Sequence, residues 1–99
     1  MNILDVPAGK IVVFCHKWKI VEFALFGSIL REDFGPESDV DVLVTFAKDA
    51  NWSLYDLVDM QDELSSIFGR DVDLVLKSGL HNPFRRHEIL RTCRVIYAA

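Results

Sequence analysis

Apolar residues recur along this chain with two different periods, and their alternation predicts alternating helices and strands. Residues 7–19 place apolar side chains three and four apart after a proline suited to a first helical turn, which predicts a helix. The run at 11–14, Ile-Val-Val-Phe, would also fit a strand. Residues 20–26 are apolar, rich in aromatic residues and end at Gly27, which is typical of a strand.

A second strand is predicted at residues 40–46, after a short link. Within that link, Ser28 is placed to cap a short helical segment from residue 29 to about residue 33. The pair Gly35-Pro36 should end this segment. Because the link is short, the two strands can pair in an antiparallel manner.

A long helix is predicted next. Asn51 or Ser53 can cap its start, with Asp56 in a capping-box position after Ser53, and Gly69 is a natural stop. We expect the apolar stripe of this helix to consist of Leu54, Leu57, Val58, Leu64 and Phe68.

The remaining residues predict a third strand, a last helix and a short edge strand. The third strand covers residues 72–76, Asn82-Pro83 opens the helix, and residues 95–97 form the edge strand. One face of the helix should carry Arg86, Ile89, Leu90 and Cys93. The predicted fold is therefore an α/β (α+β) domain, with a mixed sheet of three to four strands flanked by helices.

Composition fits a folded protein with one small core. The chain has 99 residues, of which 51% are hydrophobic and 26% are charged, so residues 1–99 are expected to form a single domain. The net charge of −4 argues against direct nucleic-acid binding, which needs basic residues to neutralise phosphates. Four arginines nevertheless crowd the C-terminal stretch. They fit a solvated helix face, or a contact with a triphosphate or a partner: Arg85, Arg86, Arg91 and Arg94.

The sequence also predicts the state of the two cysteines and the location of the chain. Cys15 and Cys93 have no paired spacing and form no zinc pattern with the three histidines, so we expect buried, reduced thiols. Neither a signal peptide nor an apolar run of membrane-spanning length is present in the sequence. The expected location is the cytoplasm, with no membrane association.

The residues that could carry chemistry are three aspartates. Asp39 and Asp41 open the second strand, and residues two apart on a strand share a face, with Cα atoms about 6.6 Å apart. Asp73 lies on the third strand and could supply a third carboxylate. Two carboxylates ~4 Å apart at an effective dielectric near 20 repel by about 4 kcal/mol. At least one carboxyl pKa should therefore be raised, and a Mg²⁺ ion would relieve the repulsion.

Gly27 and Ser28 supply a possible phosphate site. A glycine at a strand-to-helix turn lets the backbone approach a phosphate, and the following amides and the Ser28 hydroxyl can donate to it. Arg31 could reach the same anion or pair with a nearby acid. Each piece alone is a weak signal. Their order, with Gly-Ser after one strand, Asp-x-Asp opening the next and an acid on a third, is far more specific.

Residues 24–46 resemble the signature of the DNA polymerase beta-like nucleotidyltransferase superfamily, in which Gly-Ser and Asp-x-Asp are joined by a short helix and loop. The small size resembles the minimal nucleotidyltransferase branch, whose members include antitoxins paired with HEPN-domain toxins. The similarity continues through residues 53–57 and 69–75 and covers about residues 8–97.

This resemblance implies a role for each residue. The phosphate motif would be Gly27 and Ser28, and the ligands of Mg²⁺, with two ions expected, would be Asp39, Asp41 and Asp73. Arg31 falls where small members often carry arginine. The nucleotide substrate would be ATP. Larger relatives of this superfamily have further domains that grip the base and the acceptor, and this chain is expected to lack them.

Three functional hypotheses follow. The first is an enzyme that transfers AMP from ATP to a tyrosine hydroxyl of a HEPN toxin, with Asp73 as the candidate to help deprotonate the acceptor. The second is a binding module that neutralises its partner by contact alone, through apolar side chains among Phe84, Trp52 and the C-terminal helix, although each fits a core better. The third keeps the nucleotidyl transfer but uses a small-molecule alcohol as the acceptor. Trp18 and Trp52 are expected to pack rather than to stack on a base.

Overall fold

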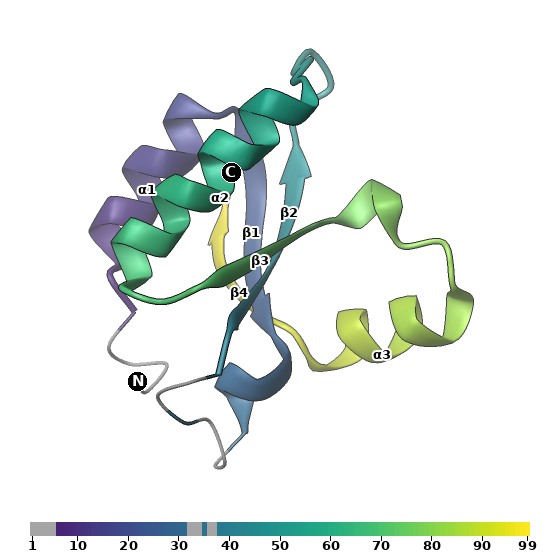
Figure 1. The fold of residues 1–99 in the computed structure, drawn as a ribbon. Helices are drawn as coiled ribbons and strands as arrows, with labels where there is room; N and C mark the ends of the chain where they lie inside the picture. The colour runs from purple at the N-terminus through teal and green to yellow at the C-terminus, as the bar shows by residue number, and fades with distance from the viewer. Residues whose placement is uncertain (1–5, 32–34, 36–37) are drawn as a thin grey trace.

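A mixed four-stranded sheet lies between helices in the structure, a computed structural model that describes residues 6–31, 35 and 38–99 (Figure 1). The three longer predicted helices and the predicted strands are confirmed, and the ambiguous run at 11–14 is helical. Their bounds are α1 Ala8–Lys17, β1 Ile20–Phe26, η2 Gly27–Leu30, β2 Val40–Phe46, α2 Leu54–Phe68, β3 Val72–Leu76, η3 Lys77–Gly79, α3 Pro83–Thr92 and β4 Arg94–Ala98.

The strands are ordered β3-β2-β1-β4. β1 pairs antiparallel with both β2 and β4, and β2 pairs parallel with β3. The short link after β1 allows the first antiparallel pairing, whereas parallel strands need a long crossover, which α2 provides. The expected mixed sheet, with a short edge strand at the C-terminal end, is therefore confirmed.

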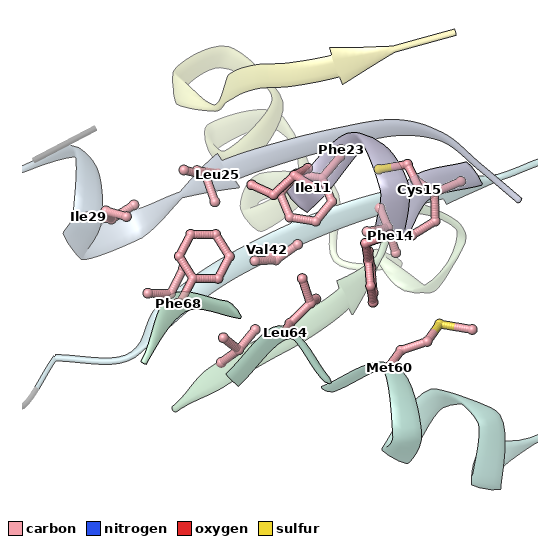
Figure 2. Close-up of a cluster of buried hydrophobic side chains, with 14 residues drawn as sticks. Ile11, Phe14, Cys15, Phe23, Leu25, Ile29, Val42, Met60, Leu64 and Phe68 are labelled. Carbon is pink, nitrogen blue, oxygen red and sulfur yellow. The ribbon is translucent and has the colours of Figure 1, made fainter. Parts of the chain in front are cut away.

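Two apolar clusters hold the layers together. The larger one joins α1 and α2 to one face of the sheet and includes Phe14, Phe23 and Leu64 (Figure 2). The smaller one joins α3 to the other face and contains Ala24, Phe26, Leu43, Leu80 and Ile89. Accordingly, α1 and α2 lie together on one side of the sheet in Figure 1, and α3 lies on the other.

The ends of α2 follow the predicted chemistry, but its buried stripe differs from the prediction. Met60, Leu64 and Phe68 are buried, whereas Leu54 and Val58 are 79% and 58% exposed. At 100° per residue, Val58 lies about 120° around the helix from Leu64, so it cannot face the same core. Helical spacing alone fits both the predicted and the observed sets of buried residues, because apolar residues surround the first two turns of α2.

Ser53 caps α2 through a complete capping box. Its hydroxyl accepts from the Asp56 amide, and the Asp56 carboxylate accepts from the Ser53 amide at 2.9 Å. Ser53→Ala should lower the free energy of unfolding by about 1 kcal/mol, because backbone donors at the helix start lose their partners. Urea denaturation measures this. Ser66→Ala, at an exposed position inside α2, is the control, and it should change stability by less than ~0.5 kcal/mol.

The turn after β1 differs from the sequence prediction. The 3₁₀ turn η2 begins at Gly27 and not after Ser28, and Ser28 makes no capping hydrogen bond to it. Gly27 turns the chain at once, because its φ of 75° lies in the left-handed region. The later part of the predicted segment, residues 32–33, and Pro36 lie outside the described residues.

Of the side chains expected in the core, some are buried and others are exposed. Cys15 is buried as expected, but Cys93 is only half-buried, and both thiols are free. Phe84 is 85% exposed, because it lies in the first turn of α3, away from the face that carries Ile89. Trp18 and Trp52 pack edge to face with ring centroids 5.2 Å apart, as predicted. Within the described ranges, no helix is long and apolar enough to cross a membrane.

Candidate active site on the α3 face of the sheet

Strand alternation places Asp41 on the face of the sheet that α3 covers. Leu43 packs in the smaller cluster against Ile89, whereas Val40 and Val42 pack in the larger cluster on the other face. Because successive side chains on a strand point to opposite faces, Asp41 points to the same face as Leu43.

Asp73 lies beside Asp41 on the neighbouring strand. The parallel register pairs the Cα atoms of these two residues, and paired strands lie about 4.8 Å apart. Val75, two residues further along β3, packs against the smaller cluster, so Asp73 also points to the α3 face. The structure therefore brings together two of the three predicted acids.

Asp39 lies just before β2 and is exposed. Its negative charge nevertheless acts on Asp41 and helps to raise the pKa of that carboxyl. Across residues 6–31, 35 and 38–99, no three acidic, histidine or cysteine side chains converge as the ligands of a bound metal do. An exposed Asp39 side chain would have to turn toward the other two acids to complete such a set.

The environment of Asp41 raises its pKa above the ordinary value. Burial is the largest cause, followed by the negative charges of Asp73 and Asp39. The positive charges of Arg85 and Arg31 act in the opposite direction and only partly offset the rise in pKa. Asp41 therefore stands at the centre of a cluster of like charges, which a cation would relieve.

Gly27 provides the space that Asp41 occupies. A Cβ atom added at this glycine would overlap Oδ2 of Asp41 and would come within 3.2 Å of its Cγ. The register of β1 and β2 produces this contact, because Phe26 pairs with Asp41 and the chain turns immediately afterwards. Gly27 thus has two reasons to be glycine: the left-handed turn and the carboxylate against it.

Ser28 ties the turn to the start of β2. Its hydroxyl donates to the backbone oxygen of Asp39 at 3.4 Å, a long hydrogen bond that a stronger acceptor could replace. Arg31 follows at the end of the turn and is exposed. Its positive charge acts on Asp41, so Arg31 lies on the side of the site that carries the aspartates.

The three carboxylates are a donor set that suits Mg²⁺, which prefers oxygen ligands and keeps several waters. The pairing of Asp41 with Asp73 and the raised pKa of Asp41 show two acids held close together, with positive charges nearby that offset their repulsion only in part. By these observations the residues fit a Mg²⁺ ion, once the exposed Asp39 turns inward.

Arg85 is the residue at this site that the sequence did not single out. It was one of four C-terminal arginines with two possible roles. In the structure it differs from the other three because its positive charge lowers the pKa of Asp41. The available signal was spacing: Arg85 precedes Ile89 by four residues, so both lie on one face of α3.

An open hollow of about 630 Å³ lies next to the site, between the end of α2 and the start of β2. Asp39 borders it, but Asp41 and Asp73 do not. Arg70 shapes its wall by donating to the backbone oxygens of Gly35 and Ser38 at 2.6 and 3.3 Å. This hollow therefore meets the site only at Asp39.

Comparison with known proteins agrees with this geometry. The sequence model of the nucleotidyltransferase domain family matches residues 11–96. MJ1217 of Methanocaldococcus jannaschii, a candidate protein adenylyltransferase, is 36% identical over 74 residues, which are 75% of this chain and 74% of that protein. The protein adenylyltransferase MntA of Thermococcus cleftensis is 36% identical over 65 residues, which are 66% of this chain and 64% of that protein.

Solved structures show the same fold. A candidate minimal nucleotidyltransferase has a TM-score of 0.75 and 28% identity, with 95% of each chain covered. A toxin–antitoxin crystal structure with AMP-PNP has a TM-score of 0.76 at 20% identity, covering 94% of this chain and 74% of that one. The sequence match and the shared fold agree, and the chain belongs to the nucleotidyltransferase domain family, among the minimal nucleotidyltransferases.

Proposed function

We propose that this chain is a Mg²⁺-dependent protein adenylyltransferase that transfers AMP from ATP to a tyrosine hydroxyl of a HEPN-domain toxin and so acts as its antitoxin. The observation that carries the proposal is the Asp41–Asp73 pair beside the Gly27 turn. Two similarities support the choice of reaction and partner. One relative is named protein adenylyltransferase MntA, and one structural neighbour is a tri-AMPylated HEPN toxin of Shewanella oneidensis in complex with an MNT antitoxin.

The reaction is a displacement at the α-phosphorus of ATP. The acceptor oxygen forms a bond to this phosphorus, and the bond from it to the oxygen bridging to the β-phosphate breaks. Pyrophosphate leaves with the electron pair of the broken bond. The acceptor hydroxyl gives up its proton, and Asp73 is our candidate to receive it, because its carboxylate is exposed beside the site.

Each site residue has a distinct task in this proposal. Asp39, Asp41 and Asp73 would hold Mg²⁺, which supplies positive charge against the phosphate oxygens. The Gly27 turn and the Ser28 hydroxyl would hold the β- and γ-phosphates, with Ser28 exchanging its long bond to Asp39 for a phosphate oxygen. Arg31 would add charge on the same side.

The proposal is tested by mixing the chain with Mg²⁺, a HEPN-domain protein from the same organism that binds it, and ATP labelled at the α-phosphate. We expect the label to appear on the HEPN protein, and no label when the ATP is labelled at the γ-phosphate. A HEPN variant with its acceptor tyrosine changed to phenylalanine should stay unlabelled. Absence of label on the native pair, with both proteins folded and bound to each other, would refute the proposal.

Neutralisation by contact alone is a second candidate, favoured by one surface. The first turns of α2 expose Leu54, Tyr55 and Val58, and a partner could cover these apolar side chains. The variant in which all three site aspartates are changed to asparagine separates the candidates. It should fail to neutralise the toxin if catalysis is required, and it should still neutralise it if contact is enough.

A further inference from the structure

The four C-terminal arginines are in different situations. Arg86 donates to the backbone oxygen of Lys77 at 3.1 Å, and Arg91 pairs with Glu88 at 2.9 Å. Arg94 is the first residue of β4 and is exposed. The side chain of Arg85 makes no hydrogen bond or ion pair with any residue that the structure describes. Its guanidinium is therefore available to a ligand.

The packing of α3 places Arg85 on the face of the sheet that carries the acid pair. Ile89 anchors α3 in the smaller cluster, where Leu43 is also buried. Arg85 lies one turn before Ile89 on the same side of α3, and Asp41 lies two residues before Leu43 on the same face of β2. Arg85 also lies close enough to Asp41 for its positive charge to act on that carboxyl.

The backbone at the start of α3 is already engaged. The side chain of Asn82 accepts from the amides of Phe84 and Arg85 at 3.0 and 3.1 Å. These amides are thus not free to bind an anion, although a helix start often serves that purpose. The cap fixes the first turn of the helix, and the exposed guanidinium is the group there that can bind an anion.

We propose that Arg85 binds phosphate oxygens of the nucleoside triphosphate from the α3 side of the site, an inference that rests on the proposed function. Three carboxylates on a chain of net charge −4 repel a polyphosphate, so cationic groups beside them are needed in addition to a metal. Arginine suits this task because its planar guanidinium can donate two parallel hydrogen bonds to one phosphate.

The experiment measures binding of a non-hydrolysable ATP analogue in Mg²⁺ by calorimetry, with adenosine as a second ligand. Arg85→Ala should weaken binding of the analogue roughly 10- to 100-fold, as for loss of a charged hydrogen-bonding partner, and leave adenosine binding unchanged. Arg85→Lys should fall between, because it keeps the charge and loses the two-pronged geometry. Arg91→Ala, on the same helix but paired with Glu88, is the matched control and should bind like the parent.

The outcomes separate this inference from the proposed function. If the parent binds the analogue and transfers AMP, and Arg85→Ala binds the analogue equally well, the inference is wrong and the function stands. The inference is also wrong if Arg85→Ala keeps its nucleotide affinity and loses only transfer to the HEPN protein, since Arg85 would then contact the partner. A parent that binds no triphosphate would overturn both. Because Arg85 is exposed and offsets the repulsion around Asp41 only in part, its variants should stay folded and unfold within a few degrees of the parent.

Discussion

Replacing Asp41 with asparagine should abolish AMP transfer and make the ligand-free protein more resistant to heat. The loss of activity is expected to be on the order of 10³-fold, because a metal ion at such a site contributes several kcal/mol to stabilising the transition state. Asparagine keeps the size of the side chain beside Gly27, so the turn is preserved. The label-transfer assay with the HEPN protein measures the first effect.

The gain in stability follows from the sign of the pKa shift. Burial, then the charges of Asp73 and Asp39, raise the pKa of Asp41 in the folded protein. The folded state therefore holds this proton more tightly than the unfolded state does. The resulting stabilisation is fully present below the unfolded pKa, and it is lost as pH rises through the folded pKa. Above the folded pKa the carboxylate is charged and works against folding, and asparagine removes that penalty.

The size of this gain is small because Asp41 is only half-buried and water screens its charge. We expect at most about 1 kcal/mol, which corresponds to roughly 4–8 °C or less in the unfolding temperature of a chain of this length. Thermal unfolding in EDTA between pH 4 and pH 8 measures it. The difference between variant and parent should shrink toward the acid end, where the parent's own Asp41 becomes protonated.

Two controls define this experiment. Asp59→Asn removes a charge at an exposed position on α2, and it should change the unfolding temperature little at any pH. Adding Mg²⁺ with a non-hydrolysable ATP analogue should stabilise the parent more than Asp41→Asn, because binding to the folded state alone raises stability. An Asp41→Asn protein that is less stable than the parent in EDTA at pH 8 would contradict the like-charge cluster.

The parts of the fold that could be predicted from the sequence are those specified by neighbouring residues. Ser53 and Asp56 cap α2 within a few residues of one another, and Gly69 ends that helix in the left-handed conformation with a φ of 68°. Asn82 caps α3 in the same local way. Such signals do not depend on the rest of the chain. The buried stripe of α2 does depend on the rest of the chain, which is why Leu54 and Val58 were wrongly predicted to lie in the core.

The site required information that no local pattern carries. The position of Asp73 beside Asp41 depends on the register of two parallel strands that are separated by all of α2, and a shift of one residue would have put the two acids on opposite faces. The relation of Arg85 to Asp41 depends on how α3 packs across the sheet. The roles of the site residues in binding and catalysis stay predictions until variants are measured.

Gly27→Ala should also abolish transfer, and Gly69→Ala should not, although both changes place alanine at a positive φ. The φ values are 75° and 68°, so each alanine should cost about 1–2 kcal/mol of stability for the left-handed backbone. A Cβ at Gly69 meets no atom within 4 Å, whereas a Cβ at Gly27 overlaps the carboxylate of Asp41. The two variants therefore match in backbone strain and differ in the site.

At Gly27 the atom in the way is the end of a side chain that can rotate, so Asp41 should swing aside while the backbone stays in place. The stability of Gly27→Ala should then fall by little more than that of Gly69→Ala, whereas transfer should drop at least ~100-fold, because a misplaced carboxylate no longer meets Asp73 at the ion. Urea denaturation and the label-transfer assay measure the two quantities. Equal activity in the two variants would mean that the contact between Gly27 and Asp41 does not position the carboxylate for the reaction.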